Sequence, residues 1–138
     1  MKKILVSILS ATLALSVLQA ESKHAEEISA KQRAMVAQTK LQSSPDTSQV
    51  YVRGLICQSC GLGVRKKLVK LAFVNTKQPE KGVKLDVKAQ LVGVSVKAGM
   101  KPDPKLIAKA VEDAGYDPIL LYELDSKGKL KQVKLSSK

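Results

Sequence analysis

Two short alternating segments joined by a tight connection are the feature that most constrains the fold of this 138-residue chain. In residues 83–88 and 92–97, apolar side chains alternate with polar or small ones, which is typical of strands with one buried face. Only a few residues, among them Ala89 and Gln90, separate the two segments. Because so short a connection suits an antiparallel pair, we expect a β-hairpin near the middle of the chain.

A helix is predicted on each side of this hairpin. In residues 59–72, apolar side chains recur at the i, i+4 and i+7 spacing of a core-facing stripe, and Ser59 is the expected N-cap. The stripe consists of Val64, Leu68 and Leu71. The second helix begins after Asp103, an N-cap followed by proline, and ends at Gly115.

A strand pattern precedes the first helix, in residues 49–55, and another follows the second, in residues 119–124. The order over residues 49–124 is therefore β-α-β-β-α-β. This order predicts an α+β fold, a ferredoxin-like sandwich in which two helices cover one face of an antiparallel sheet. The first strand should have Val50 and Val52 on one face and Tyr51 and Arg53 on the other.

The flanking segments divide the rest of the chain. Residues 1–20 have a short positive start, an apolar run and a terminal Ala20, which indicates a secretory signal peptide and a periplasmic protein with no membrane span after its removal. Residues 21–48 are polar and favour helix only weakly, so we interpret them as a loose, partly helical tether. The tail, residues 125–138, is either a fifth edge strand or a solvated basic extension.

The composition narrows the classes of partner. The formal charge is +12, which suits an acidic protein, an anionic membrane or a nucleic acid. Nucleic acid is disfavoured, because the lysines are scattered singly and the chain has one Phe and no Trp for base stacking.

Both cysteines lie in the loop from Gly54 to Cys60, between the first strand and the first helix. A Cys-x-x-Cys pair can hold a soft metal ion between two thiolates, or it can cycle between dithiol and disulfide. Cys60 would sit in the first helical turn, where backbone N–H groups and the helix dipole stabilise a thiolate. A closed zinc site needs four ligands and is not expected here, because the only histidine, His24, lies in the tether.

Strand directions predict which segments surround the cysteines. The hairpin near Lys88 and the residues after the second helix, including Tyr116, should lie at the same end of the sheet as the cysteines, which we call the cysteine pole. The connection at residues 73–81 should lie at the opposite end, the far pole. Four cations are expected to form a positive rim that steers an acidic partner: Arg65, Lys66, Lys67 and Lys88.

Three segments together resemble the heavy-metal-associated domain family, which includes copper chaperones, modules of copper-transporting ATPases and a periplasmic mercury-binding protein. They are Gly54–Cys60, Gly82–Val83 and Val111–Tyr116. The resemblance covers residues 49–118 and implies the ferredoxin-like fold, with Cys57 and Cys60 as ligands of one Cu(I) or Hg(II) ion. Export makes the chain most similar to the periplasmic members.

The chain departs from the family pattern at three places. Leu55 replaces the usual Met, which is generally a packing residue. The connection at residues 73–81 is longer than usual and is either neutral for the site or a partner surface. Tyr116 stands where soluble copper chaperones often carry Lys, and its role is either packing over the core or shielding the ion.

These observations predict a carrier and not an enzyme. Two thiolates would capture a soft ion, and cysteines of a donor or acceptor protein, such as a membrane transporter, would exchange it. Gly54 and the glycines that follow the motif would keep the loop mobile. Two alternatives stay open: a periplasmic thiol–disulfide redox module, and an interaction domain that works without metal.

Overall fold

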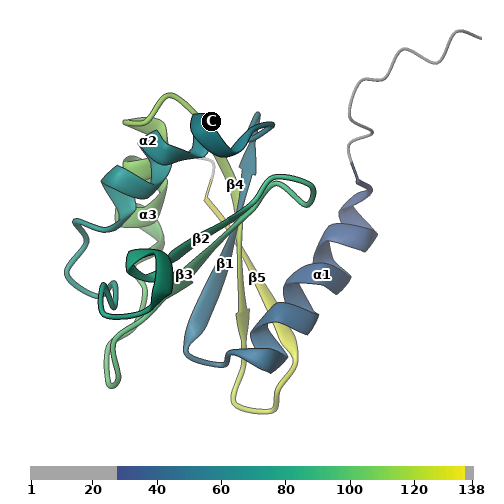
Figure 1. The fold of residues 1–138 in the computed structure, drawn as a ribbon. Coiled ribbons are helices and arrows are strands. Elements are labelled where there is room, and N and C mark those ends of the chain that lie inside the picture. The colour runs from purple at the N-terminus through teal and green to yellow at the C-terminus, as the bar shows by residue number, and fades with distance from the viewer. Residues whose placement is uncertain (1–27, 136–138) are drawn as a thin grey trace, which may run out of the picture.

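The structure is a computed structural model, and it describes residues 28–135. It is an α+β fold with three α-helices, one 3₁₀ turn and a five-stranded antiparallel sheet (Figure 1). In chain order the elements are α1 (Ala30–Ser43), β1 (Thr47–Arg53), α2 (Gln58–Leu68), η1 (Pro79–Gly82), β2 (Val83–Asp86), β3 (Leu91–Ser95), α3 (Pro104–Glu112), β4 (Asp117–Leu124) and β5 (Leu130–Lys134).

The strands are ordered β2-β3-β1-β4-β5, and every pairing is antiparallel. The expected central hairpin is confirmed, because β2 pairs with β3 from Val83 opposite Val94 to Asp86 opposite Leu91. Helices α2 and α3 lie together on one face of the sheet, and α1 lies on the other (Figure 1). The architecture is compatible with a ferredoxin-like fold, extended by α1 and by the fifth strand.

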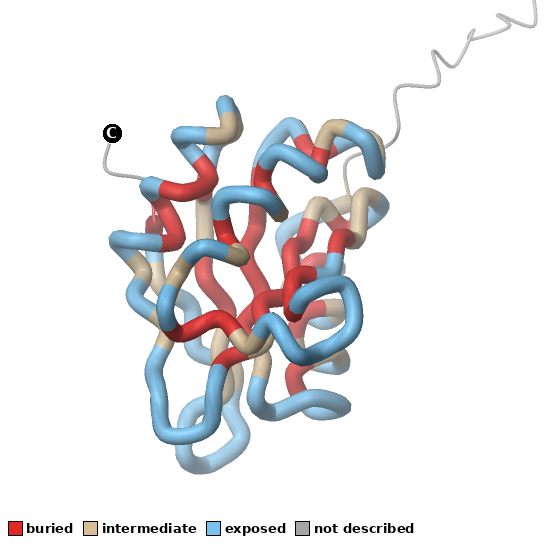
Figure 2. The backbone as a smooth tube through the Cα atoms, turned by 60° about the vertical axis from the view of Figure 1, so that its left-hand side comes forward, coloured by how far each residue is buried: buried red, intermediate tan, exposed pale blue. Residues whose placement is uncertain are grey.

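The face under α2 and α3 holds an almost wholly aliphatic core. Its buried residues come from both helices and from alternate positions of the strands. Figure 2 shows buried positions in red along the middle of the molecule, with exposed loops in pale blue around them. Val50 and Val52 belong to this core, whereas Tyr51 faces the α1 side, as the alternation predicts. Asp103 caps α3 by accepting from the Lys105 and Leu106 N–H groups.

The helix expected in part of residues 21–48 is present as α1, but it is well formed and packed against the sheet and is not loose. Ser29 and Gln32 form a reciprocal capping box, which satisfies donors at the first turn. Ala37 and Leu41 are fully buried against the outer face of the sheet. The apolar stripe is thin, but Arg33 is also buried, one helical turn before Ala37. Arg33, Ala37 and Leu41 therefore lie on one side of the helix, and these three residues are enough to pack it against the sheet.

The two alternatives for the tail are resolved in favour of a strand. Residues 130–134 pair with β4, from Leu124 opposite Leu130 to Leu120 opposite Lys134. Exposed lysines on this edge strand, Lys131 and Lys134, protect it from pairing with other chains.

The longer connection after α2 lies at the far pole, as expected. Val74 forms a β-bridge with Val96, and the Asn75 N–H donates to the carbonyl of Ser95, the last residue of β3. Phe73 and Val74 are buried, so this segment is part of the core and not a loose insertion.

Within residues 28–135 no helix combines the length and the apolar character that a membrane crossing requires. The signal peptide assigned to residues 1–20 and the histidine His24 lie outside the described residues.

Candidate functional site

The cysteine loop leaves β1 through a sharp turn at the cysteine pole. Gly54 has a φ of +84°, in the left-handed region that glycine enters without strain. Leu55 then inserts fully into the aliphatic core and pins the loop, which is the packing role expected for this position. The next side chain, Ile56, turns outward and is 70% exposed. The loop is therefore anchored at its base and open to solvent at its tip.

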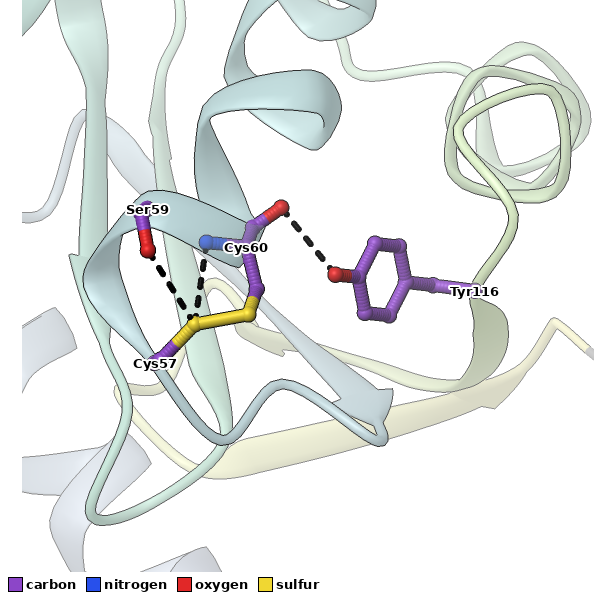
Figure 3. The surroundings of a disulfide bond; sticks show 4 residues. All are labelled: Cys57, Ser59, Cys60 and Tyr116. Atoms are coloured by element: carbon purple, nitrogen blue, oxygen red, sulfur yellow. Dashed lines mark hydrogen bonds between the residues drawn. A yellow bond between two sulfur atoms is a disulfide. The ribbon is translucent and has the colours of Figure 1, made fainter.

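Cys57 caps the helix, whereas Ser59 was the expected N-cap. The Cys57 Sγ accepts a hydrogen bond from the Cys60 backbone N–H at 3.1 Å, so α2 begins two residues earlier than the periodicity suggests (Figure 3). The Ser59 Oγ lies 3.4 Å from the same sulfur. The sulfur of Cys57 thus takes up the positive end of the helix, where an anionic sulfur is stabilised.

The two cysteines form a disulfide bond, with their Cα atoms 5.2 Å apart. Both residues are half-buried, so a partner can approach the sulfurs from the exposed side of the loop. In this oxidised form the sulfurs are bonded to one another and offer no thiolate. A two-electron reduction must precede any metal binding by the pair.

Tyr116 lies against this loop, although 56 residues separate it from Cys60. Its hydroxyl donates to the Cys60 carbonyl at 3.1 Å (Figure 3). A Cβ built on Gly54 would lie 3.7 Å from the Tyr116 ring, so the ring is also beside the start of the loop. Gly115, with a φ of +87°, turns the chain so that Tyr116 reaches this position after α3. Tyr116 therefore holds the first turn of α2 in place.

Gly61 has a role that the sequence did not reveal. It is buried, and a Cβ at this position would lie 2.5 Å from Leu85 Cδ1 and 3.1 Å from Leu55 Cδ1. The first turn of α2 can therefore sit close to the sheet only because this residue has no side chain. Gly61 brings the helix near the core and does not loosen the loop, whereas Gly63 has open space around it.

The β2–β3 hairpin completes the cysteine pole. The Val52 N–H donates to the Gln90 carbonyl, which joins the hairpin to the end of β1 just before the cysteine loop. On the other side of the sheet, the Arg33 Nε donates to the Ala89 carbonyl at 3.0 Å. Lys88 is exposed at this pole, as expected.

The other expected rim cations do not gather around the sulfurs. Arg65 is half-buried; its Nε donates to the Val83 carbonyl, and its guanidinium pairs with Glu80 towards the far pole. Lys66 and Lys67 are exposed, but they follow Cys60 by six and seven residues, a rise of about 9–11 Å along a helix. Of the four expected rim cations, Arg65 is therefore engaged away from the sulfurs, Lys66 and Lys67 lie further along α2, and Lys88 lies on the hairpin at the cysteine pole.

Asp86 ties the same hairpin to α1. Its carboxylate forms an ion pair with Lys40 at 2.7 Å and accepts from the Ala89 N–H at 3.1 Å. Partial burial by itself raises the pKa of Asp86, but the bonds from Lys40 and Ala89 outweigh burial and leave that pKa below its usual value.

The donor set limits which metal the site could hold. Among residues 28–135, no group of three or more His, Cys, Asp or Glu side chains is placed to bind one ion. Zinc and hard divalent ions usually require such a group, whereas two thiolates alone suit a soft ion in two-coordinate geometry. Once reduced, Cys57 and Cys60 fit the second requirement.

Comparison with protein-family models, with curated proteins and with solved structures found no match for this chain.

Proposed function

We propose that the chain is a periplasmic carrier of one soft metal ion, Cu(I) or Hg(II), with Cys57 and Cys60 as its ligands. The observation that carries this proposal is the placement of both sulfurs on one solvent-accessible turn, with the Cys60 N–H directed at the Cys57 sulfur. The fold supports it, because the α+β arrangement of β1 to β4 with α2 and α3 is compatible with the ferredoxin-like fold that the resemblance implies.

The first step is reduction of the disulfide. A dithiol partner transfers two electrons and two protons to the Cys57–Cys60 bond and is itself oxidised to a disulfide. The product is a pair of thiols, and the Cys57 sulfur is the one that accepts the Cys60 N–H at the start of α2.

Capture and release then follow from the shape of the loop. The two sulfurs bind the ion with loss of their protons, and the exposed tip leaves room for a third sulfur from a partner. Exchange proceeds as the partner's cysteines replace Cys57 and Cys60 one at a time. Tyr116 keeps the first turn of α2 fixed while the ligands change.

The test is a metal titration of the chain from residue 21 onward, reduced and kept free of oxygen. We expect one Cu(I) or Hg(II) per chain by native mass spectrometry against a competing ligand. Cys57→Ser should lose the ion, and Ser59→Ala should retain it as the matched control. Retention of neither ion by the reduced wild-type protein would refute the proposal, as would equal retention by the Cys57→Ser/Cys60→Ser variant.

One observation favours a second candidate, a thiol–disulfide redox module: the pair is present as a disulfide. Against it, the strand that follows α2 pairs with β3 and not in parallel with β1, so the parallel βαβ setting typical of redox Cys-x-x-Cys motifs is missing from residues 28–135. Catalytic reduction of insulin by the dithiol form, together with failure to retain metal, would establish this candidate instead.

A third candidate is an interaction domain that works without metal. The double cysteine variant distinguishes it from the other two candidates. Full function of Cys57→Ser/Cys60→Ser in the host would support it, because no sulfur chemistry would then be needed.

A further inference from the structure

A surface groove runs between α2 and η1, and the cysteine chemistry makes no use of it. It has a volume of about 350 Å³, its walls are mostly apolar, and we call it the α2–η1 groove. It is lined by Leu62, Arg65, Lys66, Val69, Glu80 and Lys81. Leu62 is 46% exposed, which is a large fraction for a leucine in the middle of a helix.

Contacts within the chain fix the position of η1, which forms one wall of the groove. Glu80 and Lys81 both have a φ of 55°, an uncommon backbone conformation for residues other than glycine. Gly82 follows with a φ of 76°, and a Cβ there would lie 2.3 Å from the Asn75 carbonyl oxygen. Arg65 fixes the same wall through its ion pair with Glu80 and its bond to the Val83 carbonyl. The groove is therefore built into the fold.

The groove suits a single apolar side chain more closely than a membrane. The broad apolar face of α2, which includes Val64 and Leu68, is fully buried in the core and is not available to lipid. Outside the core the helix exposes Leu62 as its one large hydrophobic residue. Peripheral membrane helices instead present a wide apolar face with several large residues.

The charges around the groove indicate the chemistry of its occupant. Lys66 and Lys81 stand on opposite walls, and no ion pair joins either of them to another described residue. Arg65 is already neutralised by Glu80, and two more exposed lysines follow, Lys67 on α2 and Lys70 just after its end. An aliphatic side chain that enters between these cations should be flanked by carboxylates.

We propose that the α2–η1 groove binds an acidic protein segment that inserts one aliphatic side chain beside Leu62 and pairs its carboxylates with Lys66 and Lys81. Leu62 lies within one helical turn of Cys60, and the rest of the groove extends from it towards the far pole. The binding itself does not depend on the state of the cysteines or on the proposed metal chemistry.

The experiment uses a panel of fluorescent twelve-residue peptides, each with one Leu, Ile, Met or Phe between Asp and Glu residues, titrated by anisotropy at low salt. We expect at least one peptide to bind, and Leu62→Ser to weaken that binding by about tenfold. Lys81→Glu should weaken it to a similar extent. Raising the salt concentration should weaken it in the wild type.

Matched controls separate this surface from general effects. Leu106 on α3 is also 46% exposed, so Leu106→Ser changes an equally exposed leucine elsewhere and should leave binding unchanged. Lys105→Glu is the corresponding charge control on α3. The Cys57→Ser/Cys60→Ser variant should bind like the wild type, so a failure of the metal proposal would leave this result intact.

Three outcomes would overturn the inference. The first is that no peptide in the panel binds the wild-type chain better than it binds Leu62→Ser. The second is that Leu106→Ser and Lys105→Glu weaken binding as much as the groove variants do. The third is that vesicles of phosphatidylglycerol bind in a Leu62-dependent way while no peptide does, which would assign the groove to a membrane surface.

Discussion

The two faces of the sheet are closed by different means. Under α2 and α3 the contacts are mostly aliphatic, with the buried Phe73 and the partly buried Tyr116 as the aromatic residues among the described positions 28–135. Under α1 the contacts include two tyrosines, Tyr51 and Tyr122, and the buried Arg33, whose guanidinium lies 3.6 Å from the Tyr51 ring centroid. Burial raises the pKa of Tyr122, although the nearby Arg33 charge partly opposes this.

The two faces therefore contribute differently to the cysteine pole. The aliphatic face provides the rigid base on which Leu55 anchors the cysteine loop. The α1 face adds directional bonds, and two of them reach the β2–β3 hairpin at the cysteine pole: Arg33 to Ala89 and Lys40 to Asp86. Helix α1 thus contacts the cysteine pole from the face of the sheet opposite α2 and α3.

The largest expected effect comes from paired leucine truncations, one on each face. Leu68 on α2 and Leu41 on α1 are both fully buried. Leu68→Ala should lower the free energy of unfolding by about 2–5 kcal/mol, and Leu41→Ala by a value near the lower end of that range, because its cluster is smaller. Urea denaturation followed by circular dichroism measures both. A negligible effect of Leu41→Ala would mean that α1 does not close its face in solution.

Arg33→Met should have the next largest effect. It keeps an unbranched side chain in the same space but removes the bonds to the Ala89 and Ile28 carbonyls and the contact with Tyr51. The cost should be about 1–3 kcal/mol, since buried carbonyls lose a charged donor.

Hydrogen exchange gives a sharper readout of the same variant. The amides of residues 87–90 should exchange faster in Arg33→Met, while those of α2 should change little. Equal acceleration in both segments would argue that Arg33 supports the whole fold and not the hairpin in particular.

Tyr116→Phe should have a smaller effect, on the opposite side of the sheet. It removes the bond to the Cys60 carbonyl but keeps the ring beside Gly54, so we expect a loss of about 0.5–1.5 kcal/mol. The reduced variant should also react faster with iodoacetamide, because the first turn of α2 is less restrained. Unchanged reactivity would limit Tyr116 to a packing role.

The smallest effect is expected at the ion pair between Lys40 and Asp86. Asp86→Asn should cost at most about 1 kcal/mol at pH 7, because both side chains are roughly a third exposed. Since folding lowers the pKa of Asp86, its contribution is present above the unfolded value of about 3.9 and is lost as the pH falls through the folded value. The stability difference between wild type and variant should therefore shrink below pH 4. A difference that grows with acid would contradict this assignment.

The sequence alone was enough to predict the core elements and the pole to which each connection belongs. Alternation placed Val50 and Val52 on one face and Tyr51 on the other, and strand direction placed Tyr116 beside the cysteines. These predictions succeed because side-chain periodicity and strand direction are local properties that tertiary packing seldom reverses.

Several details of the site could not be predicted from the sequence. Cys57 and not Ser59 caps α2, because a sulfur also accepts an N–H and the capping patterns do not include it. Arg65 left the expected rim because Glu80, fifteen residues away, forms an ion pair with it. The burial of Gly61 under Leu85 also depends on a residue from another element.

The sequence by itself determined the order of β1 to β4 with α2 and α3, the pairing of the central hairpin and the position of the Cys-x-x-Cys motif at the start of a helix. Only the tertiary structure decided that α1 packs against the sheet, that the two sulfurs form a bond to one another, and that the α2–η1 groove exists. The physical reason is range: periodicity and turn chemistry act over a few residues, whereas these three features join residues through space and form only when the chain is folded.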